Sequence, residues 1–242
     1  MKKLAIALAV AALLAAVPAA AQHNYAPDGA LCFGSKPGTD EQVVIACLSI
    51  VHSPIFTDSI YLAYYDLGRA YQRMGKYVDA QTSYLYSIKA RHDYVAAWQG
   101  YGEAGEKLGQ AGLVMSSLNQ AIAANPINPK VYNDVCWVRA VLNQQLDVAI
   151  ADCNESLRLD PSNKFTLDSR CFANFRKADY INAVADCDAA LKLDSTLPSS
   201  LYVRGLAKLR LGYAQMGQAD IAAATAIDAN IAKTYAAYGV TP

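Results

Sequence analysis

Six cysteines and three histidines are the side chains of this 242-residue sequence best suited to covalent or metal chemistry. No C-x-x-C pair occurs, so a catalytic dithiol is not indicated. The histidines have no ligand-like spacing to one another or to the cysteines, and no zinc site is expected. An even number of cysteines is instead typical of the disulfide framework of an exported protein. The cysteines are Cys32, Cys47, Cys136, Cys153, Cys171 and Cys187.

Motifs of enzymes and nucleotide-binding proteins are almost absent. GYGEAG at 100–105 matches G-x-G-x-x-G, but it follows Trp98 in a helical pattern rather than a strand, so we do not expect a nucleotide there. The sequence has no G-x-S-x-G, H-E-x-x-H or P-loop. We expect Asp152, Asp186 and Asp188 to lie on a solvated helix face rather than to form an acid/base pair. No catalytic residue, cofactor or metal is predicted, and we expect a non-catalytic protein.

The first residues have the pattern of an export signal. A basic Met1-Lys2-Lys3 start precedes an apolar stretch and the small residues Ala19-Ala20-Ala21, which predicts residues 1–21 as a signal peptide cleaved after Ala21. The mature chain would then be periplasmic or secreted. Later apolar runs are shorter than the roughly 18 residues that span a bilayer, so we expect no stable membrane insertion. Lys+Arg equals Asp+Glu at 21 each, a balance that argues against nucleic-acid binding.

The chain repeats itself with a period of about 34 residues. IADCNESLRLD at 150–160 and VADCDAALKLD at 184–194 are two versions of one helix. The copy with the fullest pattern contains Tyr64, Leu67, Gly68, Tyr71, Gly75, Tyr77, Ala80, Tyr84 and Ser87. This pattern resembles the tetratricopeptide repeat (TPR) position by position. The resemblance implies an all-α fold: a right-handed superhelical solenoid of helix-turn-helix repeats with N- and C-terminal capping helices.

The repeat register divides the sequence into segments. We expect an N-terminal coil and capping helix at 22–60, four repeats at 61–197, and a degenerate fifth repeat with a C-terminal capping helix at 198–242. Within the first segment, 24–40 is predicted as coil and 41–51 as the cap. At the other end, Ile231, Tyr235 and Tyr238 share one face of a helix that Gly239 ends.

The register also suggests the disulfide pairs. Cys136 and Cys171 both occupy the small-residue position of a first helix, whereas Cys153 and Cys187 both occupy a bulky position of a second helix. Facing positions in two equivalent hairpins favour Cys136 with Cys153 and Cys171 with Cys187. Cys32 would then pair with Cys47. Cys153 with Cys171, which would link adjacent repeats, is the main alternative.

In such repeats the first helices line the concave side of the solenoid. The residues that flank their packing positions define the predicted concave groove, charged in its N-terminal half and aromatic in its C-terminal half. Exposed aromatic side chains in a groove favour recognition of an extended peptide or a partner helix. The alternative is that Trp137, Phe172 and Phe175 fill the core between repeats. The predicted groove residues are Tyr65, Arg69, Arg73, Gln99, Glu103, Asn133, Trp137, Asp168, Phe172, Phe175 and Tyr202.

Two segments near the C-terminus resemble exported TPR proteins of Gram-negative bacteria. They are GLAKLRLG at 205–212 and ADIAAATAIDANIAKTYAAYGVTP at 219–242. That resemblance implies an interaction module without catalytic activity. The leading hypothesis is a periplasmic scaffold or adaptor that binds an envelope protein or peptide in the concave groove. One alternative is an accessory subunit or enzyme acting on a non-protein envelope ligand such as glycan. Another is a self-associating structural protein whose own termini fill the groove, and the oligomeric state is not indicated.

Overall fold

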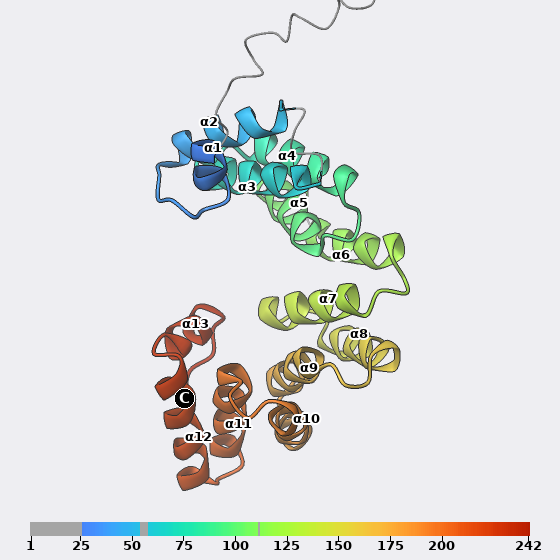
Figure 1. Cartoon of the computed structure of the whole chain (residues 1–242). Helices are drawn as coiled ribbons and strands as arrows, with labels where there is room; N and C mark the ends of the chain where they lie inside the picture. The colour runs from blue at the N-terminus through green and yellow to red at the C-terminus, as the bar shows by residue number, and fades with distance from the viewer. Residues whose placement is uncertain (1–25, 54–57, 111) are drawn as a thin grey trace, which may run out of the picture.

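The computed structural model describes residues 26–53, 58–110 and 112–242, and every regular element in these ranges is a helix (Figure 1). The expected signal peptide lies outside the described residues. The helices are α1 (Ala26–Cys32), α2 (Asp40–Val51), α3 (Ile60–Arg73), α4 (Tyr77–Ala90), α5 (Val95–Lys107), α6 (Leu113–Ala124), α7 (Pro129–Leu142), α8 (Leu146–Leu159), α9 (Lys164–Arg176), α10 (Tyr180–Leu193), α11 (Pro198–Arg210), α12 (Ala214–Ile227) and α13 (Ile231–Ala237). None of the helices in the described part of the chain is long and apolar enough to span a bilayer.

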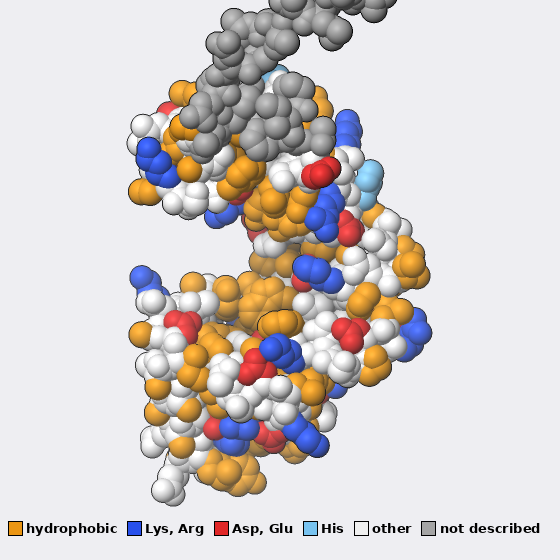
Figure 2. All heavy atoms as spheres, viewed as in Figure 1, with side chains coloured by type: hydrophobic (Ala, Val, Ile, Leu, Met, Phe, Trp, Pro, Cys, Tyr) orange, Lys and Arg blue, Asp and Glu red, His pale blue; other side chains and the backbone are white. Residues whose placement is uncertain are grey.

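Helices α3 to α12 form five successive antiparallel hairpins that stack into a curved solenoid. First helices of neighbouring hairpins contact one another, in the order α3, α5, α7, α9 and α11. Neighbouring second helices make no such contacts in the described ranges. The first helices therefore lie on the inside of the curve, and Figures 1 and 2 show the resulting C shape with its hollow between the two ends.

In the first and last of these hairpins, a glycine on the first helix faces a larger residue on the second helix. A Cβ atom added to Gly68 would lie 2.8 Å from the ring of Tyr84. In the last hairpin, the same addition at Gly205 would lie 2.8 Å from both Ile221 and the main-chain oxygen of Gly217. These distances are too short for a real Cβ contact, so glycine is what allows the helices to approach so closely.

Disulfides replace this small-to-large pairing in two hairpins. Cys136 bonds to Cys153 with a Cα–Cα distance of 5.5 Å, and Cys171 bonds to Cys187 with 5.3 Å. The four residues occupy the register positions that Gly68 and Tyr84 occupy in the first repeat. These are the within-hairpin pairs that the register favoured, and the alternative link between adjacent repeats does not occur.

The N-terminal segment differs from its prediction. Part of the stretch predicted as coil is helix α1, and Cys32 at its end is bonded to Cys47 of α2. The capping helix is present as α2, which begins at a capping box in which Thr39 and Gln42 exchange hydrogen bonds. Helices α1 and α2 thus form another disulfide-linked hairpin. The apolar face of α2 packs against both α1 and α3, which joins this hairpin to the first repeat.

The carboxylates expected on a solvated face are mostly buried, which corrects that expectation. Asp152 and Asp186 are buried and pair with Arg139 and Arg170 of their own hairpins. Asp220 repeats the arrangement with Arg204 and Lys208. Each arginine also reaches the preceding second helix, where the acceptors are Asn119 for Arg139, Asn154 for Arg170 and Asp188 for Arg204. This polar ladder joins successive hairpins, and of the three predicted carboxylates Asp188 alone is solvated.

Candidate interaction groove

The predicted groove residues lie on the first helices as expected, but they fall into three parts with different surroundings. We call these parts the N-terminal pocket, the middle pocket and the covered part. Tyr65, Arg69, Arg73, Gln99 and Glu103 line the N-terminal pocket. Asn133, Trp137 and Asp168 line the middle pocket. Phe172, Phe175 and Tyr202 belong to the covered part.

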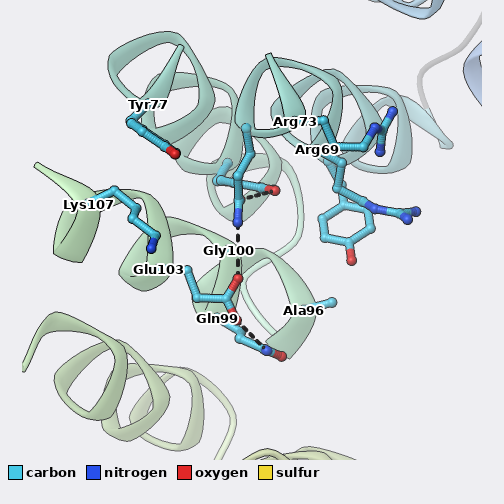
Figure 3. A pocket seen from close by; sticks show the side chains of 11 residues that line it. Arg69, Arg73, Tyr77, Ala96, Gln99, Gly100, Glu103 and Lys107 are labelled. Atoms are coloured by element: carbon cyan, nitrogen blue, oxygen red, sulfur yellow. Dashed lines mark hydrogen bonds between the residues drawn. The ribbon is translucent and has the colours of Figure 1, made fainter. Parts of the chain in front are cut away.

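The N-terminal pocket has a volume of about 450 Å³ and lies between α3, α4 and α5. A chain of hydrogen bonds crosses its floor (Figure 3). The hydroxyl of Tyr84 donates to Oε1 of Gln72 at 2.8 Å, and Nε2 of Gln72 donates to Oε2 of Glu103 at 3.2 Å. Nε2 of Gln99 donates to the other oxygen of Glu103 at 2.7 Å. These bonds fix three polar side chains from two neighbouring first helices.

Charged side chains surround this floor. Arg73 pairs with Asp40 of α2 at 2.6 Å, and Arg69 lies 3.4 Å from Asp66. Lys107, at the end of α5, lines the pocket and forms no ion pair with any described residue. Burial raises the pKa of Tyr65, so its hydroxyl remains protonated and can donate a hydrogen bond. The pocket thus offers one free cation from the described residues and several fixed polar groups.

The middle pocket has a volume of about 600 Å³ and lies along α7 and α9, with Ser199 of α11 at its edge. Trp137 is half-buried there, and Phe165, which the sequence did not single out, is 56% exposed. Asn133 accepts a hydrogen bond from Ser169 at 2.9 Å. The pocket therefore combines aromatic walls with amide, hydroxyl and carboxylate groups.

The covered part corrects the expectation of an open aromatic groove. Phe172 and Tyr202 are 0% exposed and Phe175 is 8% exposed. The rings of Phe172 and Tyr202 both contact Tyr235 of α13, with centroid distances of 5.2 and 5.1 Å. Phe175 packs instead against Tyr180 of its own hairpin. All three are core residues. For Phe172 and Phe175 this is the alternative that the sequence had left open.

Helix α13 packs against α11 and α12 of the last hairpin and lies at the end of the C-terminal arm that faces the hollow (Figure 1). Tyr238, just after it, contacts the ring of Trp137 on α7 at 5.9 Å. Main-chain oxygens of this C-terminal segment are also bound: Arg176 donates to Tyr238 at 3.0 Å and Arg210 to Thr241 at 3.1 Å. The C-terminal segment of the chain therefore covers part of its own concave side, over α9 and α11, through aromatic and main-chain contacts.

The other chemical candidates have structural roles in the described part of the chain. GYGEAG lies within α5, where Gly100 approaches Tyr84 and Gly102 approaches the backbone of Val114. No group of three or more His, Cys, Asp or Glu side chains among the described residues is placed to hold a metal ion.

Solved structures with the same architecture are numerous. A TPR protein from Parabacteroides merdae is 14% identical, with a TM-score of 0.56 over 88% of this chain and 87% of that one. PilW, a type IV pilus biogenesis factor, is 16% identical, with a TM-score of 0.55 over 70% and 78%. A thermophilic TPR protein of Thermus thermophilus is 18% identical, with a TM-score of 0.53 over 74% and 98%.

No protein-family model and no curated relative matches this chain. The hairpin stack, the repeat register and the solved structures agree, and the chain has the fold of tetratricopeptide repeat proteins.

Proposed function

We propose that this protein is a non-catalytic scaffold or adaptor that binds a protein or peptide segment in the part of its concave groove that α13 leaves open. The main support is the C-terminal segment itself. Arg176 and Arg210 donate to its main-chain oxygens, and Tyr235 packs between aromatic rings of α9 and α11. The groove therefore already has the chemistry for holding a short segment of polypeptide.

The open pockets offer similar contacts to a second segment. In the N-terminal pocket, Gln99 and Glu103 are held in place by hydrogen bonds and Lys107 is free to meet a carboxylate or a main-chain oxygen. In the middle pocket, Trp137 and Phe165 present aromatic surface. Fixed polar groups beside exposed aromatic side chains are typical of protein-binding surfaces, because little conformational entropy is lost when a partner binds.

We further propose that the protein acts in the periplasm and that its partner is an envelope protein or peptide. Three disulfides each join the two helices of one hairpin, and disulfides persist in oxidising compartments. The signal-like pattern of residues 1–21 supports the same location. A fusion of the first 30 residues to alkaline phosphatase tests this: activity in the periplasm is expected, and activity lost without residues 1–21 would tie export to this segment. Equal export without them would contradict the proposal.

Capture of the partner tests the interaction itself. We would tag the mature chain at its N-terminus, because the C-terminal segment lies in the groove, and use cell-envelope extract. Lys107→Glu reverses a charge in the N-terminal pocket, and Lys192→Glu makes the same change on the exposed side of α10. A partner retained by the wild type and Lys192→Glu but lost by Lys107→Glu is expected. A partner that both variants retain equally would place the interaction outside this pocket and contradict the proposal.

A further inference from the structure

The middle pocket contains a buried carboxylate that no cation of the described chain neutralises. Asp168 of α9 is 9% exposed and lines the pocket. The other buried carboxylates of the described residues, Asp152, Asp186 and Asp220, each pair with an arginine. No Lys or Arg of the described chain pairs with Asp168, which accepts hydrogen bonds from Ser199 at 2.8 Å and Ser200 at 2.5 Å.

Two serine hydroxyls leave this carboxylate incompletely satisfied. An ionised carboxylate has about four acceptor positions, and the serines use one position on each oxygen. The serines lie in the first turn of α11, whose positive end also favours a negative charge. Burial nevertheless raises the pKa of Asp168, with the two serines acting in the opposite direction. Asp168 thus has free acceptor positions for a cation, and a cation bound beside it would favour its ionised form.

The surroundings of Asp168 favour a particular kind of cation. Lys130, the basic side chain that lines this pocket, already pairs with Asp134, so these two charges cancel and an ionised Asp168 has no counter-charge in the pocket lining. Trp137 and Phe165 supply aromatic surface beside it. Aromatic faces attract cations and also pack well against the methylene stems of long basic side chains.

We propose that the middle pocket receives one lysine or arginine side chain of the bound partner segment, whose charged head pairs with Asp168 while its stem packs against Trp137 and Phe165. This proposal rests on the proposed function and specifies its chemistry: the partner carries a basic residue where it crosses α7 and α9. The volume of about 600 Å³ is ample for such a side chain.

The test uses single amino-acid probes and needs no identified partner, so its result is independent of whether capture succeeds. N-acetyl-arginine amide is compared with N-acetyl-citrulline amide, which has nearly the same shape but no charge. The readout is the indole N–H signal in NMR spectra of the mature chain. The protein has two tryptophans, and Trp98 serves as an internal reference because its indole donates to the carbonyl of His92 outside this pocket.

We expect the arginine probe to shift the Trp137 signal and not the Trp98 signal, with at least tenfold weaker binding of the citrulline probe. Asp168→Asn keeps an acceptor for the serines and should weaken the arginine probe at least tenfold. Asp188→Asn, an exposed carboxylate on α10, should leave binding unchanged. Equal binding of the two probes, no response of Trp137, or full binding by a folded Asp168→Asn variant would overturn the proposal. The comparison of the two probes on the wild type remains decisive if Asp168→Asn does not fold.

Discussion

The ring of Tyr235 meets the ring of Phe172 edge to face, with centroids 5.2 Å apart and an interplanar angle of 89°. This contact joins α13 to α9, the first helix of the fourth of the five hairpins. Tyr235 also contacts Tyr202, so one side chain covers the aromatic rings of both α9 and α11 on the concave side. The groove available to a partner is therefore shorter than the solenoid.

Removing the Tyr235 ring should loosen this closure. We expect Tyr235→Ala to lower the free energy of unfolding by about 3 kcal/mol, because a fully buried aromatic side chain is lost and leaves a cavity. Chemical denaturation measures the loss. Phe172 and Tyr202 should also become accessible, which binding of a hydrophobic dye would report.

Tyr235→Phe is the matched control. The Tyr235 hydroxyl is buried without a hydrogen-bond partner in the described structure, so its removal should leave the protein at least as stable as the wild type. A loss from Tyr235→Phe as large as that from Tyr235→Ala would show that the hydroxyl, not the ring, holds the segment in the groove.

The polar ladder should be costly to interrupt at its most buried member. Arg139 is 0% exposed and pairs with Asp152. Asp152→Asn would leave that arginine buried without its counter-charge, and we expect a loss of about 3–5 kcal/mol. Asp188→Asn removes an exposed partner of Arg204 and should cost less than about 1 kcal/mol. Similar small losses from both variants, measured by denaturation, would contradict a structural role for the ladder.

The disulfide pairs can be mapped directly. A non-reducing peptide map should recover Cys136 linked to Cys153 and Cys171 linked to Cys187. Replacing Cys136 and Cys153 together with alanine should reduce stability by roughly 3 kcal/mol, because the unfolded chain regains the freedom of the closed loop. A peptide that links Cys153 to Cys171 would show that the two hairpins are joined differently.

One turn offers a stabilising substitution. Ala178 follows the end of α9 with φ of 63°, where the first and fifth repeats have Gly75 and Gly212 with φ of 74° and 86°. The left-handed conformation is unfavourable for a residue with a Cβ atom, while glycine adds entropy to the unfolded chain. We expect a net gain of about 0.5–1 kcal/mol from Ala178→Gly. A lower melting temperature for this variant would contradict that estimate.

The sequence predicted the fold because the repeat period is a property of neighbouring hairpins. The same register also predicted the disulfides. Cys136 and Cys171 occupy the position of Gly68, and Cys153 and Cys187 occupy the position of Tyr84, so each pair faces across one hairpin. The surface against which α13 packs could not be predicted. The helical spacing of Ile231 and Tyr235 predicts that one face of α13 is buried, as it is, but it does not indicate which helices cover that face.

The prediction that Asp152 and Asp186 are solvated was wrong, and it was made because both side chains carry a charge. Acidic residues are seldom buried unless they are paired, so a solvated face was the simpler expectation. A signal was available: Asp152, Asp186 and Asp220 recur in register, each with a facing Arg on its first helix. Lys107 and Phe165 were missed because their access to the pockets depends on how far neighbouring hairpins rotate, which no local pattern records.

Site-specific photo-crosslinking in the native cell envelope tests the central claim most directly. The photoreactive residue p-benzoylphenylalanine would replace Tyr77, an aromatic residue that lines the N-terminal pocket, in one strain and Lys192 on the exposed side of α10 in another, so that Lys107 stays in place. We predict a discrete protein adduct from position 77 and none from position 192. An adduct from position 192 alone, or none from position 77 while the protein is folded and present, would contradict the open groove as the binding surface.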